Sequence, residues 1–158
     1  MAEHYSTKGS IKVPVALKTH IKTIADAYYT ATKKDIVVTS GKRTAWSQAD
    51  ALYTRFQKGG NVNDYVAQKQ AKAIKKAYDD AVKLKKNKSA IITDMEAVLK
   101  NQIKNGKYLS KHLSSKALDV RKKNMSKIEQ KAFLKACKAT AKRCLVEGTP
   151  EHFHIQFK

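Results

Sequence analysis

The sequence predicts an α+β fold in which several helices surround a small antiparallel sheet, all within a single domain over residues 1–158. Apolar residues recur at helical spacing in several segments, and short apolar runs of strand length lie between those segments. A chain of 158 residues suits one domain, and a hydrophobic content of 42% is enough for a packed core.

Helical periodicity dominates the first half of the chain. Leu17, Ile21, Ile24 and Tyr28 follow Pro14, a residue that suits the first turn of a helix. Further on, one side of a long lysine-rich segment is apolar, which is typical of an amphipathic helix packed on a core. The elements expected here are a helix after Pro14, a strand over 35–39, and helices over 46–57 and 64–86.

Two capping boxes indicate the later helices. Thr93 with Glu96, and Ser126 with Glu129, have the spacing at which two side chains cap the start of a helix reciprocally. The first of these helices is expected to end near 104, before an Asn-Gly pair, and the second near 142. Short extended segments are expected over 117–120, 143–146 and 153–157.

The two cysteines, Cys137 and Cys144, are seven positions apart on the last predicted helix. Side chains two turns apart on one straight helix are too distant for a disulfide, and the spacing is not that of a C-x-x-C pair. We therefore expect two buried free thiols.

The charge of the chain restricts the class of its partners. Thirty-three Lys and Arg residues against 13 Asp and Glu give a formal net charge of +20, which favours polyanionic partners such as nucleic acid, anionic lipid or a bacterial cell wall. No RNA-recognition motif, zinc finger or basic zipper is present, so no specific nucleic-acid binding is expected. No apolar run of 18 residues exists, so no membrane span is expected either.

His112 and Asp119 lie in an unusual local context. On one helix their separation would be about 10 Å, too far for two ligands of one metal, so the chain between them must fold back if they act together. Ser114 and Ser115 are suitable residues for such a turn. Asp119 itself lies in an apolar run, where a carboxylate needs a partner, either a metal or an arginine.

The end of the chain has a similar feature. On an extended strand His152 and His154 point to the same face, with Phe153 on the other. Glu151 would point away from His154 on a straight strand. Pro150 suggests that the regular strand begins slightly later, so that a bend could turn Glu151 toward the histidines.

These residues fit an ordered family pattern. The chain resembles the zinc D-Ala-D-Ala peptidases and L-alanyl-D-glutamate endopeptidases, which share a fold with the Hedgehog signalling domain. Their pattern is S-x-H-x-x-G-x-A-x-D followed by E-x-x-H, with an S-G-x-R-T segment upstream. The matching residues here are Ser110, His112, Ala117 and Asp119, then Glu151 and His154, and upstream the segment 40–44 followed by Gln48.

The resemblance implies a zinc site with an open position. His112, Asp119 and His154 would ligate the ion and leave the fourth position to water. Glu151 would be the general base that takes the proton of that water.

The resemblance also implies substrate contacts. Arg43 would hold a substrate carbonyl or carboxylate and stabilise the oxyanion, unless it forms a salt bridge within the core. His152 would donate a hydrogen bond to the oxyanion or to a backbone carbonyl. Ser110 would contact substrate, and Gln48 would be either a substrate contact or a structural hydrogen-bonding residue.

One residue departs from the family pattern. The glycine position is occupied by Ser115, which is strained by about 1–3 kcal/mol if the turn needs a positive φ.

The sequence thus predicts a monomeric zinc peptidase that cleaves peptidoglycan stem peptides. Because residues 1–10 lack the apolar stretch of a secretory signal, we expect it to be made in the cytoplasm and to reach the anionic cell wall by phage lysis, as an endolysin, or as a delivered antibacterial effector. The alternatives are a D,D-carboxypeptidase and a non-catalytic zinc-containing binding module of the same fold.

Overall fold

The computed structural model describes residues 2–148 and 151–158 and divides the chain into two compact units. Unit 1 comprises Met1–Lys42 and Ser115–Lys158, and unit 2 comprises Arg43–Ser114. Each unit has its own cluster of buried apolar side chains. The expectation of a single domain over 1–158 stays a prediction.

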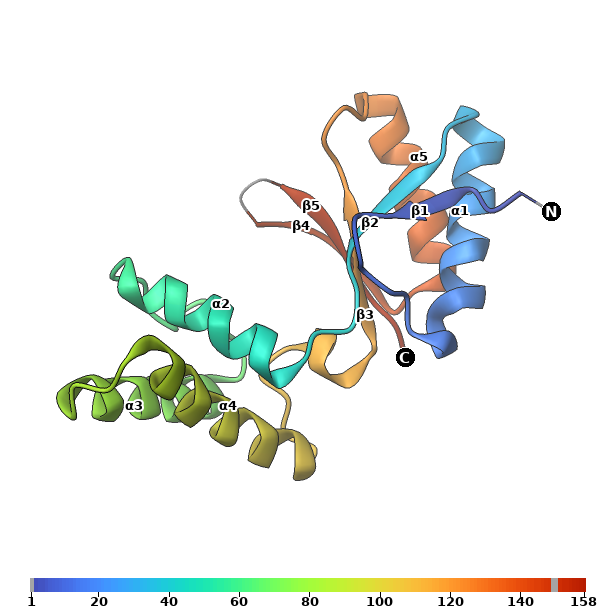
Figure 1. The fold of residues 1–158 in the computed structure, drawn as a ribbon. Coiled ribbons are helices and arrows are strands. Elements are labelled where there is room, and N and C mark those ends of the chain that lie inside the picture. Colours follow the sequence, from blue (N-terminus) through green and yellow to red (C-terminus); the bar gives the residue numbers. More distant parts are fainter. Residues whose placement is uncertain (1, 149–150) are drawn as a thin grey trace. The chain divides into compact units, whose positions relative to one another are not determined.

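Unit 1 contains a five-stranded sheet in the order β1-β2-β3-β5-β4 (Figure 1). β1 pairs parallel to β2, and the other pairings are antiparallel. The α+β class is therefore confirmed, but the expectation of an antiparallel sheet is wrong at one edge. The strands are β1 (Tyr5–Thr7), β2 (Ile36–Ser40), β3 (Ala117–Arg121), β4 (Arg143–Glu147) and β5 (His152–Gln156).

The parallel pairing follows from the connection between β1 and β2. That connection contains the short 3₁₀ turn η1 (Val15–Leu17) and the helix α1 (Lys18–Thr32), and parallel neighbours need a crossover of this length. β1 was not expected from the sequence, because it has only three residues and two of them are exposed.

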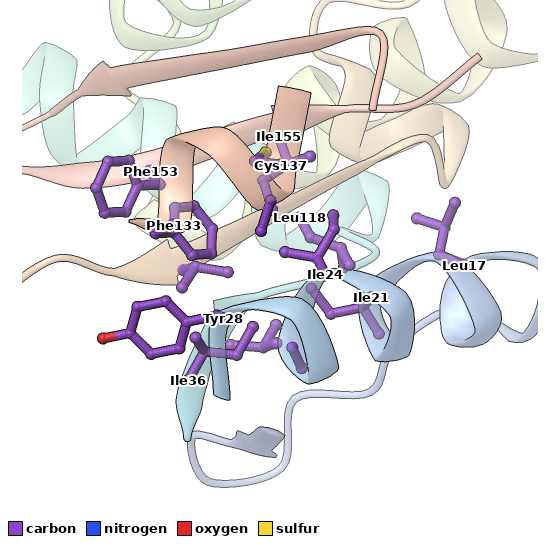
Figure 2. Packing of buried hydrophobic residues seen from close by; sticks show 14 of the residues in the cluster. Leu17, Ile21, Ile24, Tyr28, Ile36, Leu118, Phe133, Cys137, Phe153 and Ile155 are labelled. Atoms are coloured by element: carbon purple, nitrogen blue, oxygen red, sulfur yellow. The ribbon is translucent and has the colours of Figure 1, made fainter. Parts of the chain in front are cut away.

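Helices α1 and α5 (Lys127–Thr140) pack on the same face of the sheet (Figure 1). Figure 2 shows the centre of this core, where Phe133 of α5 lies between Tyr28 and Phe153, with ring centroids 6.1 and 4.4 Å away. Leu118 and Val120 of β3 are fully buried on that face. Because side chains alternate along a strand, Asp119 between them points to the opposite face.

The two cysteines form a disulfide, which corrects the expectation of free thiols. The prediction was wrong because α5 ends at Thr140, so that Cys137 and Cys144 do not share one helix. The chain turns back after Thr140 and Cys144 lies on β4, which brings the two Cα atoms to 6.4 Å, within the usual range for a disulfide.

Unit 2 is helical. Its elements are α2 (Ala45–Gln57), α3 (Gln68–Lys83), α4 (Lys88–Lys104) and the short 3₁₀ turn η2 (Lys111–Ser114). Side chains from the three long helices, with Leu109 and Leu113, bury one another. Among the helices in the described part of the chain, none is both long enough and apolar enough to cross a membrane.

Helix caps agree with the sequence in one case and differ in another. Ser126 and Glu129 form the expected capping box of α5. The box expected from Thr93 is wrong, because α4 already begins at Lys88 with Asn87 as its cap, and the Thr93 hydroxyl donates to the Ser89 carbonyl inside the helix. Asparagine is as good an N-cap as threonine, and it precedes a longer helical run.

The turn before β3 has a backbone conformation that glycine adopts more readily than serine. Ser115 has a φ of 59°, in the left-handed region. A residue with a Cβ costs roughly 1–2 kcal/mol there relative to its normal conformation.

We therefore expect Ser115→Gly to raise the free energy of unfolding by about 1 kcal/mol, since glycine relieves the strain and loses part of that gain through chain entropy. Thermal and urea unfolding of the variant would measure it. Ser114→Gly, within η2, is the matched control and should not stabilise the chain. A Ser115→Gly variant no more stable than the wild type would contradict the strain argument.

Candidate metal centre

Strands β3 and β5 place Asp119 and His154 side by side. The two residues are directly opposite each other in the antiparallel pairing, so their side chains leave the sheet on the same face. That face lies opposite the apolar one covered by α1 and α5. The next pair on this face, two positions along the strands, is Arg121 with His152, which extends the polar row.

Asp119 and His154 form a buried hydrogen-bonded pair. The distance from His154 Nδ1 to Asp119 Oδ1 is 2.9 Å, and the two residues are 6% and 7% exposed. Burial lowers the pKa of His154, but the hydrogen bond that its ring donates to Asp119 and the negative charges of Glu147 and Asp119 outweigh this effect. The net result is a pKa raised above the ordinary value of 6.5.

His112 completes a group of three possible metal ligands. One donor atom each from His112, Asp119 and His154 lies within 4.8 Å of the others, and all three residues are buried. The chain folds back between His112 and Asp119 through η2, as the spacing required, and the Ser114 hydroxyl closes that turn by donating to the Lys111 carbonyl. Two imidazoles and one carboxylate could therefore hold a metal ion.

Gln156 contacts the other ring nitrogen of His154. The distance between Gln156 Nε2 and His154 Nε2 is 3.3 Å, and Gln156 is on the same strand two residues further on. An amide can donate through its nitrogen or, after a flip, accept through its oxygen. Gln156 can thus support either tautomer of His154, including the one that leaves Nδ1 free to ligate a metal.

His152 and Glu147 form a second polar group that shares Asp119. His152 Nε2 lies 3.6 Å from Asp119 Oδ2 and 3.8 Å from Glu147 Oε1, and Glu147 Oε1 lies 3.5 Å from His154 Nδ1. The two oxygens of Asp119 thus face different histidines. Donor atoms of Asp119, Glu147 and His152 also lie within 4.8 Å of one another.

Sequence reasoning missed Glu147. The expected strand ended at Val146, one residue too early, and β4 in fact continues to Glu147, which pairs with His152. The apolar run 144–146 shows no alternation, so the face that carries Glu147 follows only from the pairing of β4 with β5, which places it opposite His152.

Glu151 lies apart from the three candidate ligands. Its carboxylate accepts a hydrogen bond from the Lys122 ammonium, and its side chain is 63% exposed. In the described part of the chain, the groups whose donor atoms lie within 4.8 Å of one another do not include Glu151. The bend expected at Pro150 lies outside the described residues.

Arg43 and Gln48 contact each other. Arg43 Nη1 donates to Gln48 Oε1 at 3.1 Å, and Gln48 is buried. The backbone N–H of Arg43 donates to the His112 carbonyl at 3.2 Å, and the His112 N–H donates to the Ser110 hydroxyl at 3.3 Å. Arg43, Gln48 and Ser110 therefore all connect to the segment that carries His112, whereas their predicted contacts with substrate stay predictions.

Just after β2 the backbone at Gly41 packs closely against the segment that carries Lys12. The register between β2 and β3 shifts between Val38 and Ser40, and Ser40 lies opposite Asp119. A Cβ on the next residue, Gly41, would press into the Lys12 carbonyl well inside van der Waals contact. Close packing thus explains why the upstream motif has a glycine at position 41.

No family model, no curated protein and no solved structure matches this chain.

The raised pKa of His154 can be tested on the metal-free chain. Asp119→Asn removes the negative charge while keeping a side chain that forms hydrogen bonds, so burial should then dominate and the pKa of His154 should fall. An NMR titration of the His154 ring would measure it. Glu129→Gln, on α5 and paired with Lys34, is the control and should leave this value unchanged. An unchanged His154 pKa in Asp119→Asn would contradict the pairing.

Proposed function

We propose that the chain is a zinc-dependent peptidase that cleaves peptide bonds in peptidoglycan stem peptides. The observation that carries the proposal is the buried group of His112, Asp119 and His154, whose donor atoms converge within 4.8 Å. The order and spacing of these residues, with Glu151 before the last of them, add the family resemblance.

The three residues suit zinc. Nitrogen and carboxylate donors at three positions are typical of catalytic zinc sites, which keep a fourth position open. Bound zinc would lower the pKa of a coordinated water far below that of bulk water, to about 7, which is the chemistry that peptide hydrolysis needs at neutral pH. Gln156, by accepting from Nε2 of His154, would keep Nδ1 available as the ligand atom.

The remaining residues have proposed roles in binding and proton transfer. Arg43, oriented by Gln48, would donate to a substrate carbonyl. His152 would hydrogen-bond the oxygen that gains negative charge. Glu151 would take a proton at its carboxylate once substrate or water displaces Lys122, and Glu147 is a second carboxylate that could do so because it already lies near His152 and His154.

The composition supports action at the cell wall. A net charge of +20 draws the protein toward an anionic polymer. The Cys137–Cys144 disulfide fits an oxidising environment outside the cytoplasm.

One observation favours a non-catalytic zinc-containing binding module as the second candidate. The carboxylate expected to act as base, Glu151, is paired with Lys122 and exposed. A module that only binds the wall needs the three ligands but no base.

Digestion of purified peptidoglycan, followed by mass spectrometry of the released fragments, tests the proposal. We expect new amino termini with the zinc-loaded wild type, and a rate about 10²–10⁴-fold lower when the general base is removed by Glu151→Ala. The new termini identify the bond and distinguish an endopeptidase from a D,D-carboxypeptidase.

Two further variants make the result specific. Glu147→Ala, assayed beside Glu151→Ala, shows which carboxylate moves the proton, and Asp79→Ala on α3 is the control that should keep full activity. No cleavage of several wall chemistries by the zinc-loaded wild type would reject the enzyme and favour the binding module.

A further inference from the structure

A hollow of about 640 Å³ opens on the same face of unit 1 as the candidate ligands. Asp119, Glu151 and His152 line it from the side of the metal centre. Thr39 and Ser40 line it from the end of β2. The volume suits a short stretch of peptide, and the hydroxyl groups can hydrogen-bond to its backbone.

Three cationic side chains also line this hollow, namely Lys8, Arg121 and Lys123. Lys8 follows β1 and is fixed there by its backbone N–H, which donates to the Val38 carbonyl at 2.9 Å. Arg121 is the last residue of β3 and lies directly opposite His152 on the same face. The cations therefore begin two residue pairs along the strands from Asp119 and His154, at the next pair on the same face.

The carboxylates of the hollow do not neutralise these cations. Glu151 pairs with Lys122, and Asp119 faces His154 and His152. Within the described ranges 2–148 and 151–158, Lys8, Arg121 and Lys123 form no ion pair with a carboxylate. The hollow thus presents positive charge whose counter-ion the described residues do not supply.

A carboxylate on the ligand fits this arrangement. The guanidinium of Arg121 can bind a carboxylate through two parallel hydrogen bonds, and the lysines add charge without demanding a fixed geometry. All three cations are exposed and so are accessible to a ligand that enters the hollow.

We propose that Lys8, Arg121 and Lys123 form a subsite for a carboxylate of an acidic peptide, beginning two residues along β3 from Asp119. This inference rests on the proposed peptidase function, and it deepens that function by requiring a negative charge close to the cleaved bond. The carboxylate comes either from an acidic residue within the peptide or from its carboxyl terminus.

Four synthetic peptides distinguish these sources. The parent is L-Ala-γ-D-Glu-L-Lys-D-Ala, and the other three carry an amide in place of the glutamyl α-carboxylate, of the terminal carboxylate, or of both. Binding is measured by NMR titration and calorimetry on the full chain after chelation of metal, so that no turnover occurs. We expect one of the two single amides to raise Kd about tenfold and the other to change it less than twofold.

The variant Arg121→Gln with Lys123→Gln tests the residues. This variant should bind the parent peptide as weakly as the wild type binds the discriminating amide peptide. The tenfold difference in Kd between those two peptides should therefore disappear. The control is Lys131→Gln with Lys135→Gln, which removes the same charge from exposed positions on α5 and should keep the discrimination. Thermal unfolding of both variants verifies their folding.

Several outcomes would overturn the subsite: no measurable binding of the parent, equal binding of all four peptides, or an equal loss of discrimination in the control variant. Failure of the proposed function is distinguishable from these. If the chain binds the acid peptides more tightly than the amides but cleaves no peptidoglycan, the subsite exists and the peptidase function is rejected. If the chain cleaves peptidoglycan but binds acids and amides equally, the peptidase function stands and the subsite is rejected.

Discussion

The arrangement of the candidate site depends on the buried pairing of Asp119 and His154 across β3 and β5. A carboxylate that is only 7% exposed is costly unless it is paired, and a partner 2.9 Å away on the neighbouring strand offsets that cost. The strand period of two then fixes the remaining positions. Leu118, Val120 and Phe153 point into the core under α1 and α5, so the polar residues between them must share the other face.

Because the apolar side chains share one face of the sheet, the polar side chains form a row on the other face, and their charge changes along that row. His112, Asp119 and His154 are buried and offer two imidazoles and one carboxylate, a donor set that can hold a metal cation. Further along, the exposed cations of the hollow suit an anion. A cation site beside an anion site matches a ligand that offers a polarisable carbonyl next to a carboxylate, and this combination links the proposed metal chemistry with the proposed substrate.

The sequence predicted much of the fold because apolar periodicity and local capping dominate it. The long helices, the central strands and the capping box at Ser126 depend on neighbours in sequence. The features that the sequence did not predict depend on contacts between distant segments. β1 is a strand because it pairs with the edge of β2, and the disulfide forms because α5 ends before Cys144. The three candidate ligands came from the resemblance to an ordered family pattern. Glu147 was missed because the strand expected from the sequence ended at Val146, whereas β4 continues to Glu147 and pairs it with His152.

Metal analysis of the purified chain tests the central claim most directly, namely that His112, Asp119 and His154 form one metal site. After zinc loading and exhaustive dialysis, we expect about one zinc per wild-type chain, almost none in Asp119→Ala, and an unchanged amount in Asp79→Ala. X-ray absorption at the zinc edge should then show two imidazole ligands. A wild type that retains no zinc, or an Asp119→Ala chain that retains as much as the wild type, would contradict the account.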